Sequence, residues 1–190
     1  QFYIANRPGS RLEAVIAAVE RAAARGVAVR VLVDALFAKK YPTTLARLKP
    51  RANITVRTLD VKAHMGGVLH AKYFLVDQQQ VWLGSQNFDW RSLAHIHELG
   101  VRLNTPGVVA AMQAVFEADW RLAAHEPALN RGAPGETASK TSHPKPLDAP
   151  KFWPAQWRGQ AVQVAAVGSP VGFLPKGLAW ELPALVRWIE

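Results

Sequence analysis

The spacing of apolar residues predicts alternating strands and helices along most of the chain. Apolar residues recur at helical spacing from Leu12 to Ala23, and Gly26 ends the run. Ser10 and Glu13, at the start of this helix, have the spacing of a capping box. Strands are predicted at residues 1–5, 27–34, 54–59, 70–77, 81–84, 98–103 and 160–167, and helices at 12–23, 42–48, 106–125 and 179–190. This order favours an α/β fold with a largely parallel sheet.

The apolar pattern is interrupted once, between residues 126 and 150. This stretch is rich in Pro, Gly, Ser, Thr and Ala and holds almost nothing able to form a core, so we interpret it as a linker. Residues 1–125 would then form one domain, truncated at its N-terminal end because Gln1 lies inside a predicted strand. Residues 151–190 would be the truncated beginning of a second half.

Composition restricts the partners and the kinds of site. The chain of 190 residues has 23 Lys and Arg against 14 Asp and Glu, a net charge of +9, which suits nucleic acid or phospholipid headgroups. Solvated positive charge without a partner is the alternative. No apolar run is long enough to cross a bilayer, so we expect a soluble or peripheral protein of unknown compartment. The absence of cysteine excludes disulfides, thiolate zinc sites and a thiol nucleophile.

A group of polar side chains interrupts the predicted strands after residue 68. His70 and Lys72 are two residues apart on a strand, so their side chains face the same side. Ser85 and Asn87 repeat this relation after the next strand, and Gly84 would let the backbone approach a ligand. If the strands pair, these side chains converge on a volume the size of one phosphate. Histidine supplies a nucleophile, and the lysine and the amide would donate to phosphate oxygens.

Two acidic residues nearby receive different interpretations. A nucleophilic imidazole needs its far nitrogen held, and Glu98 on the following strand is the candidate for orienting His70. Asp77 lies at odd spacing from His70, so on an unbent strand it faces away from the site. We interpret Asp77 as structural, either in the turn or paired with a cation.

The residues after Asn87 are candidates for contact with a substrate. Asp89, Trp90 and Arg91 could line a groove, with Trp90 stacking on a base or wedging against an acyl chain. Packing of Trp90 in the core is the alternative. His95 and His97 alternate in the same segment, but without a third ligand they do not predict a metal site.

The spacing of six of these positions resembles the HKD signature of the phospholipase D superfamily with its trailing Gly-Ser-x-Asn: His70-x-Lys72, Asp77 and Gly84-Ser85-x-Asn87. Average composition would very rarely produce so long a string by chance. The segments GGVLHAKYFLVD, GSQNFDWRSL and HELGV are most similar to the first of two HKD halves in the branch containing lysosomal phospholipase D-like 5′-exonucleases. The resemblance implies a sandwich with a mixed, largely parallel sheet flanked by helices.

The resemblance also implies a phosphodiesterase reaction in two steps that needs no metal or other cofactor. His70 would attack phosphorus to give a phosphohistidine, and Lys72 and Asn87 would hold the non-bridging oxygens. Ser85 would assist, and Glu98 would orient the histidine. The substrate would be a phospholipid, with hydrolysis or headgroup transfer, or single-stranded nucleic acid.

The chain departs from the family pattern in one respect, because no second His-x-Lys string follows the first. The expected partner is therefore a second HKD half in cis, missing from this sequence, or a second subunit. The last predicted helix stops in mid-pattern at Glu190, which favours the first interpretation. The alternative function is a catalytically inactive module that binds anions or nucleic acid.

Overall fold

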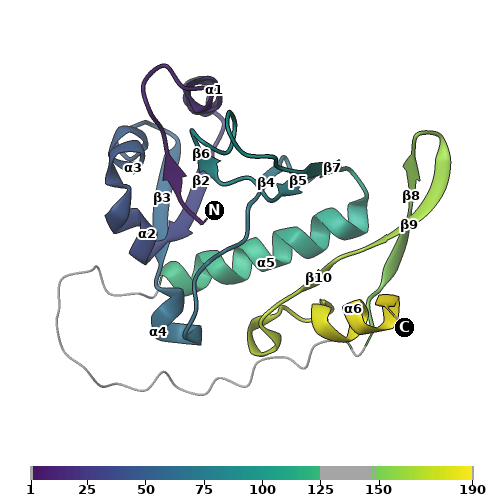
Figure 1. Ribbon diagram of the computed structural model, residues 1–190. Helices are drawn as coiled ribbons and strands as arrows, with labels where there is room; N and C mark the ends of the chain where they lie inside the picture. The colour runs from purple at the N-terminus through teal and green to yellow at the C-terminus, as the bar shows by residue number, and fades with distance from the viewer. Residues whose placement is uncertain (1, 125–146, 148, 190) are drawn as a thin grey trace. The chain divides into compact units, whose positions relative to one another are not determined.

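The structure is a computed structural model that describes residues 2–124, 147 and 149–189 (Figure 1). The chain divides into two compact units. The first contains the described residues up to 74, then 83–101 and 120–124; the second contains 75–82, 102–119 and the described residues from 147 onward. The predicted linker lies outside the described residues except for positions 147, 149 and 150, so it stays a prediction.

The first unit combines parallel strand pairs with short helices, which places the chain in the predicted α/β class. Strand β2 pairs in parallel with β3, and β1 pairs in parallel with β6. The elements of this unit are β1 (Ile4–Ala5), α1 (Leu12–Ala24), β2 (Val29–Asp34), α2 (Ala35–Lys40), α3 (Pro42–Leu48), β3 (Ile54–Leu59), α4 (Val61–Met65) and β6 (Phe88–Asp89).

A core of aliphatic side chains joins the helices of this unit to its strands. Leu12 and Ile16 of α1 are almost fully buried and belong to one cluster with Val33 of β2 and Leu48 of α3. The helical spacing in α1 explains this arrangement, because Leu12 and Ile16 are four residues apart and share one face of the helix. The end of β2 is therefore anchored on a packed layer.

The predicted capping box at the start of α1 is wrong. The Ser10 hydroxyl donates to the side-chain oxygen of Asn6 instead, 3.0 Å away, and the residue at the N-cap, Arg11, makes no side-chain cap. Glu13 accepts hydrogen bonds from Asn6 and from Arg47 of α3. Glu13 pairs with Arg47 from another helix instead of closing the box, and a local sequence pattern does not show such a partner.

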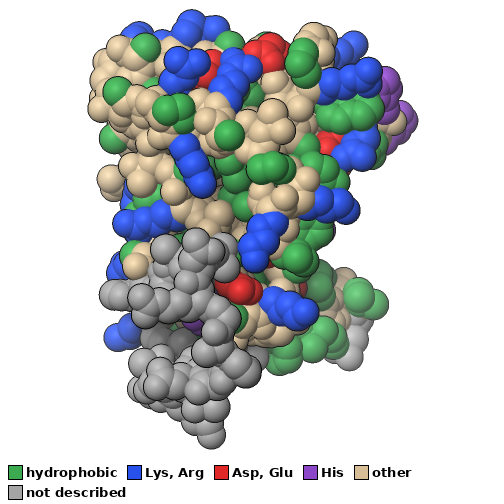
Figure 2. All heavy atoms as spheres, turned by 90° about the vertical axis from the view of Figure 1, so that its left-hand side faces the viewer, with side chains coloured by type: hydrophobic (Ala, Val, Ile, Leu, Met, Phe, Trp, Pro, Cys, Tyr) green, Lys and Arg blue, Asp and Glu red, His purple; other side chains and the backbone are tan. Residues whose placement is uncertain are grey.

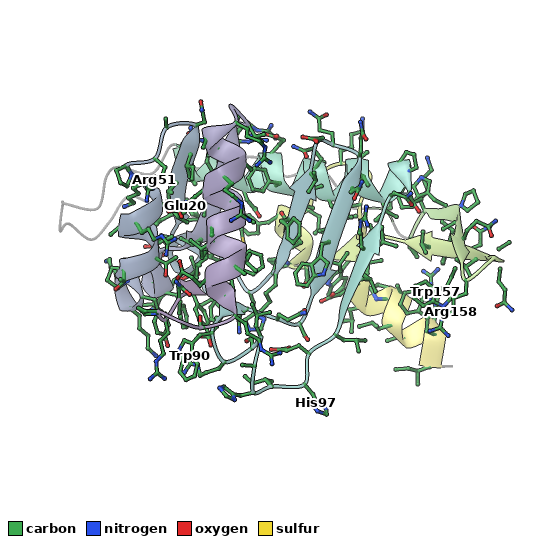
Figure 3. The ribbon with its side chains drawn as sticks, turned by 90° about the horizontal axis from the view of Figure 1, so that it is seen from above. Glu20, Arg51, Trp90, His97, Trp157 and Arg158 are labelled. Atoms are coloured by element: carbon green, nitrogen blue, oxygen red, sulfur yellow. The ribbon has the colours of Figure 1, made fainter. Side chains whose placement is uncertain are left out.

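The cation Arg47 joins two acidic residues of α1 in an ion-pair network. It lies 2.5 Å from Glu13 and 2.7 Å from Glu20, and Arg51 also reaches Glu20 at 3.2 Å (Figure 3). Hydrogen bonds from Arg47 are the main reason that the pKa of both carboxyls is lowered. Since the unfolded chain binds these protons more tightly, the network stabilises the fold above the usual carboxyl range and is lost as the pH falls through the lowered pKa.

One three-stranded sheet has the order β4, β5, β7, from strands Tyr73–Val76, Gln80–Gly84 and Gly100–Leu103. A tight turn joins β4 to β5, in which the Gln79 amide donates to the Val76 carbonyl over 3.0 Å. Asp77 and Gln78 have φ of 51° and 57°, the left-handed values of a primed hairpin turn. Asp77 thus lies in the turn that joins β4 to β5, and its structural role stays a prediction.

The second unit contains a hairpin, most of the long helix α5 and the shorter helix α6. Strand β8 (Phe152–Trp157) pairs antiparallel with β9 (Gln160–Ala165), and α5 (Pro106–Ala124) belongs to it up to Asp119. On α5, Gly107 has no room for a Cβ because the Trp153 ring occupies that space. The remaining elements are β10 (Val167–Gly168), a 3-10 turn at Val171–Phe173, β11 (Ala179–Trp180) and α6 (Glu181–Ile189). No helix in the described part of the chain is long and apolar enough to span a bilayer.

Candidate active site

His70 and Lys72 contact each other just before β4. The Lys72 ammonium nitrogen lies 2.8 Å from Nδ1 and 2.9 Å from Nε2 of the histidine ring, and it donates to the His70 carbonyl over 2.6 Å. The strand begins at Tyr73 and not at His70 as predicted, and the His70 carbonyl accepts this ammonium. Strand pairing nevertheless reaches back to Lys72, whose carbonyl accepts from the Gly84 amide over 3.0 Å.

Burial and charge shift the pKa of both side chains downward. Lys72 is only 8% exposed, and burial lowers the pKa of its ammonium while the charge of Glu98 opposes the shift. His70 is exposed as a residue, but its ring lies against neighbouring groups; loss of solvent and then the Lys72 charge lower the pKa of His70. The imidazole is therefore neutral at pH 7, with a lone pair on one ring nitrogen.

The carboxylate of Asp34 holds the backbone next to His70. It is 2% exposed at the end of β2, and one oxygen accepts from the amides of Leu36 and Phe37 at the start of α2. The other oxygen accepts from the Leu69 amide over 2.8 Å. Sequence analysis gave Asp34 no role beyond the end of a strand. Only the residue type was a signal, because Asp is a common N-cap, and the helix that it caps was itself not predicted.

Ser85 and Glu98 form the second half of the site. The Ser85 hydroxyl donates to the Glu98 carboxylate over 2.5 Å and accepts from the Leu99 amide over 3.0 Å. The backbone of the two segments is also joined, since the Ser85 amide donates to the Leu99 carbonyl over 2.9 Å. This pair therefore lies where the end of β5 meets the segment that leads into β7.

The two halves are linked through Lys72 and not through the histidine ring. The charge of Glu98 acts on the Lys72 ammonium. The Lys72 carbonyl accepts a hydrogen bond from the amide of Gly84, the residue before Ser85. Among the described residues, His70 and Glu98 share no hydrogen bond. The structure thus places the carboxylate beside the hydroxyl, whereas we expected it to orient the ring.

Gly84 and Asn87 occupy tight positions around Ser85. A Cβ on Gly84 would lie 2.6 Å from the Leu99 carbonyl and 2.9 Å from the Gly100 Cα, so the glycine admits the neighbouring backbone. The side-chain oxygen of Asn87 is buried and has no hydrogen-bond partner in the described chain. Because an unpaired buried acceptor is costly, this oxygen would gain from a donor brought by a ligand or by another part of the protein.

The three candidates for a substrate groove, Asp89, Trp90 and Arg91, differ in their exposure to solvent. Asp89 is 1% exposed, so it lies inside the protein and does not line a groove. Its burial opposes ionisation, but hydrogen bonds from Arg91 outweigh that effect and lower the pKa of Asp89. Trp90 is half-buried, with its ring near the guanidinium groups of Arg7 and Arg91 (Figure 3).

Histidines in the loop after β6 do not assemble a metal centre. His95 packs edge-on against Trp90, with ring centroids 5.7 Å apart, and His97 lies further along the same loop (Figure 3). Across the described residues, no group of three His, Asp or Glu side chains is arranged to hold a metal ion.

Comparison with known proteins gives the relatives of this chain. Residues 2–120 match the family model described as "Cardiolipin synthase, PLD-like domain". The virion nicking-joining enzyme of Monkeypox virus is 39% identical over 99 residues, which is 52% of this chain and 23% of that protein. The 5'-3' exonuclease PLD3 of Macaca fascicularis is 37% identical over 111 residues, 58% of this chain and 22% of that protein.

A solved structure shares the fold. NucT from Helicobacter pylori superposes with a TM-score of 0.51 and 17% identity, covering 57% of this chain and 72% of that one. The chain itself spans only about a quarter of the length of the curated relatives that it matches.

Proposed function

The chain belongs to the phospholipase D superfamily, and on that premise we propose that it carries the nucleophile half of a phosphodiesterase that works through a phosphohistidine on His70. The observation that supports this most is the contact between a neutral imidazole and a buried lysine. A neutral ring can attack phosphorus, and an adjacent ammonium can stabilise the charge that develops on phosphate oxygens.

In the proposed first step, the unprotonated ring nitrogen of His70 forms a bond to phosphorus while the bond from phosphorus to the leaving oxygen breaks. That oxygen takes a proton from an acid that a second HKD half, in cis or from a second subunit, would supply. In the second step water attacks phosphorus, its proton passes to the same group, and the bond between nitrogen and phosphorus breaks. A phosphomonoester and a regenerated histidine result.

The other site residues receive supporting roles in this proposal. Lys72 and Asn87 would hold the non-bridging oxygens. Ser85 and Glu98 act as one unit, because the 2.5 Å hydrogen bond between them fixes the hydroxyl. The charge of Glu98 opposes the lowering of the Lys72 pKa that burial causes. The proton donor would come from a second HKD half in cis or from a second subunit.

A phosphohistidine can be trapped in the full-length protein. Incubation with a radiolabelled oligonucleotide in EDTA, a quench in base and mapping of the labelled peptide should place an acid-labile label on His70. His95→Ala, which removes an exposed ring outside the site, should keep the label, and His70→Ala should lose it. Activity that needs a divalent metal, or that survives His70→Ala, would sink the proposal.

A catalytically inactive binding module is the second candidate, because the sequence contains no second His-x-Lys string. Such a module would bind phosphate or nucleic acid through its positive charge. Turnover by this 190-residue chain that rises with the concentration of a dimer would exclude it and would favour two paired copies.

The salt dependence of binding distinguishes the two candidate substrates, phospholipid and nucleic acid. Binding to nucleic acid releases counterions, so the affinity for oligonucleotides should fall steeply with added salt. A nuclease would show that dependence without matching affinity for vesicles, and a lipase would show the reverse.

A further inference from the structure

Four aromatic rings form a continuous row beside the candidate nucleophile. We call Phe2, Phe37, Tyr3 and Tyr41 the aromatic row. Phe2 and Phe37 have ring centroids 4.0 Å apart, Phe37 and Tyr3 are stacked at 5.7 Å, and Tyr3 and Tyr41 are stacked at 4.8 Å. All four residues are half-buried, so each keeps part of its surface in contact with solvent.

One end of the aromatic row touches the catalytic pair. The Phe2 ring lies 4.7 Å from the His70 ring, and the Lys72 ammonium lies 5.1 Å from the Phe2 centroid. A ligand that stacks on the row would therefore extend directly to the nitrogen that attacks phosphorus.

The other end of the row carries positive charge. The exposed Lys40 places its ammonium 5.8 Å from the Phe37 centroid and 5.6 Å from the Tyr41 centroid. Figure 2 shows many more Lys and Arg than Asp and Glu side chains on the face it presents, in agreement with the net charge of +9. A row of rings with cations near its ends suits a chain of bases linked by phosphates.

Buried carboxylates hold the row in place. Asp89 accepts hydrogen bonds from Arg91, and burial and then the negative charge of Asp89 raise the pKa of the Tyr3 hydroxyl. Asp34 caps α2 through the amide of Phe37. Rings that are fixed before a ligand arrives lose little conformational entropy on binding, which favours affinity.

We propose that the aromatic row binds unpaired nucleobases of a single nucleic-acid strand whose phosphodiester lies at His70. This deepens the proposed function and rests on it. A choline-type headgroup would be repelled by Lys40, whose ammonium lies near the rings of Phe37 and Tyr41. An acyl chain gains nothing from ammonium groups at both ends of the row.

Strands with and without bases separate stacking from phosphate contacts. In the full-length protein with His70→Ala to prevent turnover, we would measure binding to a labelled oligothymidylate and to an abasic strand of the same length. Phe37→Leu and Tyr41→Leu should each weaken binding to oligothymidylate about tenfold and leave the abasic strand unchanged, because only bases stack. Tyr41→Phe keeps the ring and should bind nearly as the parent does.

Two controls match these changes. Trp157→Leu removes an exposed ring outside the row and should bind both strands normally. Lys40→Ala should weaken binding to both strands more than Lys39→Ala does, since Lys39 carries the same charge but makes no contact with a ring of the described chain.

Equal loss on both strands, or no loss in Phe37→Leu and Tyr41→Leu, would overturn the aromatic row as a base-binding site. If the same variants lose affinity for vesicles of anionic phospholipid instead, the row serves a membrane lipid. Neither result touches the label on His70, so the proposed function and the row can fail separately.

Discussion

The two halves of the candidate site differ in how deeply they are buried and in the interactions that hold them. On one side Lys72 is 8% exposed beside His70, and both have a lowered pKa. On the other side Ser85 and Glu98 meet through a short hydrogen bond in a more open position. Burying a cation costs free energy, whereas a hydrogen bond between neighbouring segments costs little. Under the proposed function, the first half would supply the reactive groups and the second half would hold its hydroxyl and carboxylate in position.

Replacing the buried cation tests this contrast most severely. Lys72→Met in the full-length protein should reduce kcat by about 100-fold or more, because a preorganised donor to phosphate is lost. The free energy of unfolding should stay equal or rise by about 1 kcal/mol, since an apolar chain replaces a buried charge. Steady-state kinetics and urea unfolding measure the two effects. A large drop in stability with normal kcat would show that the lysine is structural.

Removing the carboxylate behind the first half should mainly cost stability. Asp34→Ala leaves the amides of Leu36, Phe37 and Leu69 without their acceptor, so the free energy of unfolding should fall by about 2–3 kcal/mol. Because the backbone beside His70 is released, kcat should also fall, about tenfold. Asp34→Asn keeps one acceptor oxygen and should lose less of both. Urea unfolding and steady-state kinetics measure the two effects. Equal stability and equal kcat in the parent, Asp34→Ala and Asp34→Asn would contradict this role of Asp34.

Titration of His70 sharpens the electrostatic side of the comparison. The lowered pKa keeps the ring neutral, so the acid limb of the rate profile should lie below the usual histidine range. Lys72→Met should raise the pKa of His70 only part of the way, because loss of solvent is the larger cause. Glu98→Gln should lower the pKa of Lys72 further by removing the opposing charge. NMR titration follows both groups, and full recovery of the His70 pKa in Lys72→Met would contradict the order of causes.

The second half should respond least. Ser85→Ala removes the hydroxyl that donates to Glu98 and accepts from Leu99, at an exposed position. We expect kcat to fall by less than about tenfold and the free energy of unfolding by about 1 kcal/mol. A loss in kcat as large as that of Lys72→Met would erase the distinction between the two halves.

Local pattern explains which elements could be predicted. Helix α3 and strand β3 have the predicted bounds, Pro42–Leu48 and Ile54–Leu59, because proline and apolar spacing mark their ends in the sequence itself. Helix α2 was missed, since Ala35–Lys40 is short and its start depends on amides that donate to the carboxylate of a strand residue. The α/β class was predictable, whereas the packing of α2 against the N-terminal rings was not.

The alternation of side chains along a strand explains which part of the candidate site could be predicted. Two residues of separation predicted that His70 and Lys72 would share a side, and the structure brings them into contact. The partner of Glu98 was not predictable, because it depends on which segment crosses the end of β5. The aromatic row joins residues from three separate stretches of the first 41 positions, and no spacing rule relates them.

The cap formed by Asp34 has a consequence for how this protein could change over evolution. Its bonds go only to main-chain amides, so they do not depend on which side chains follow in α2. Positions 36, 37 and 40 could therefore be exchanged while the helix and the strand leading to His70 keep their geometry. Substrate preference could drift by mutation in a single short helix without the chemistry being rebuilt.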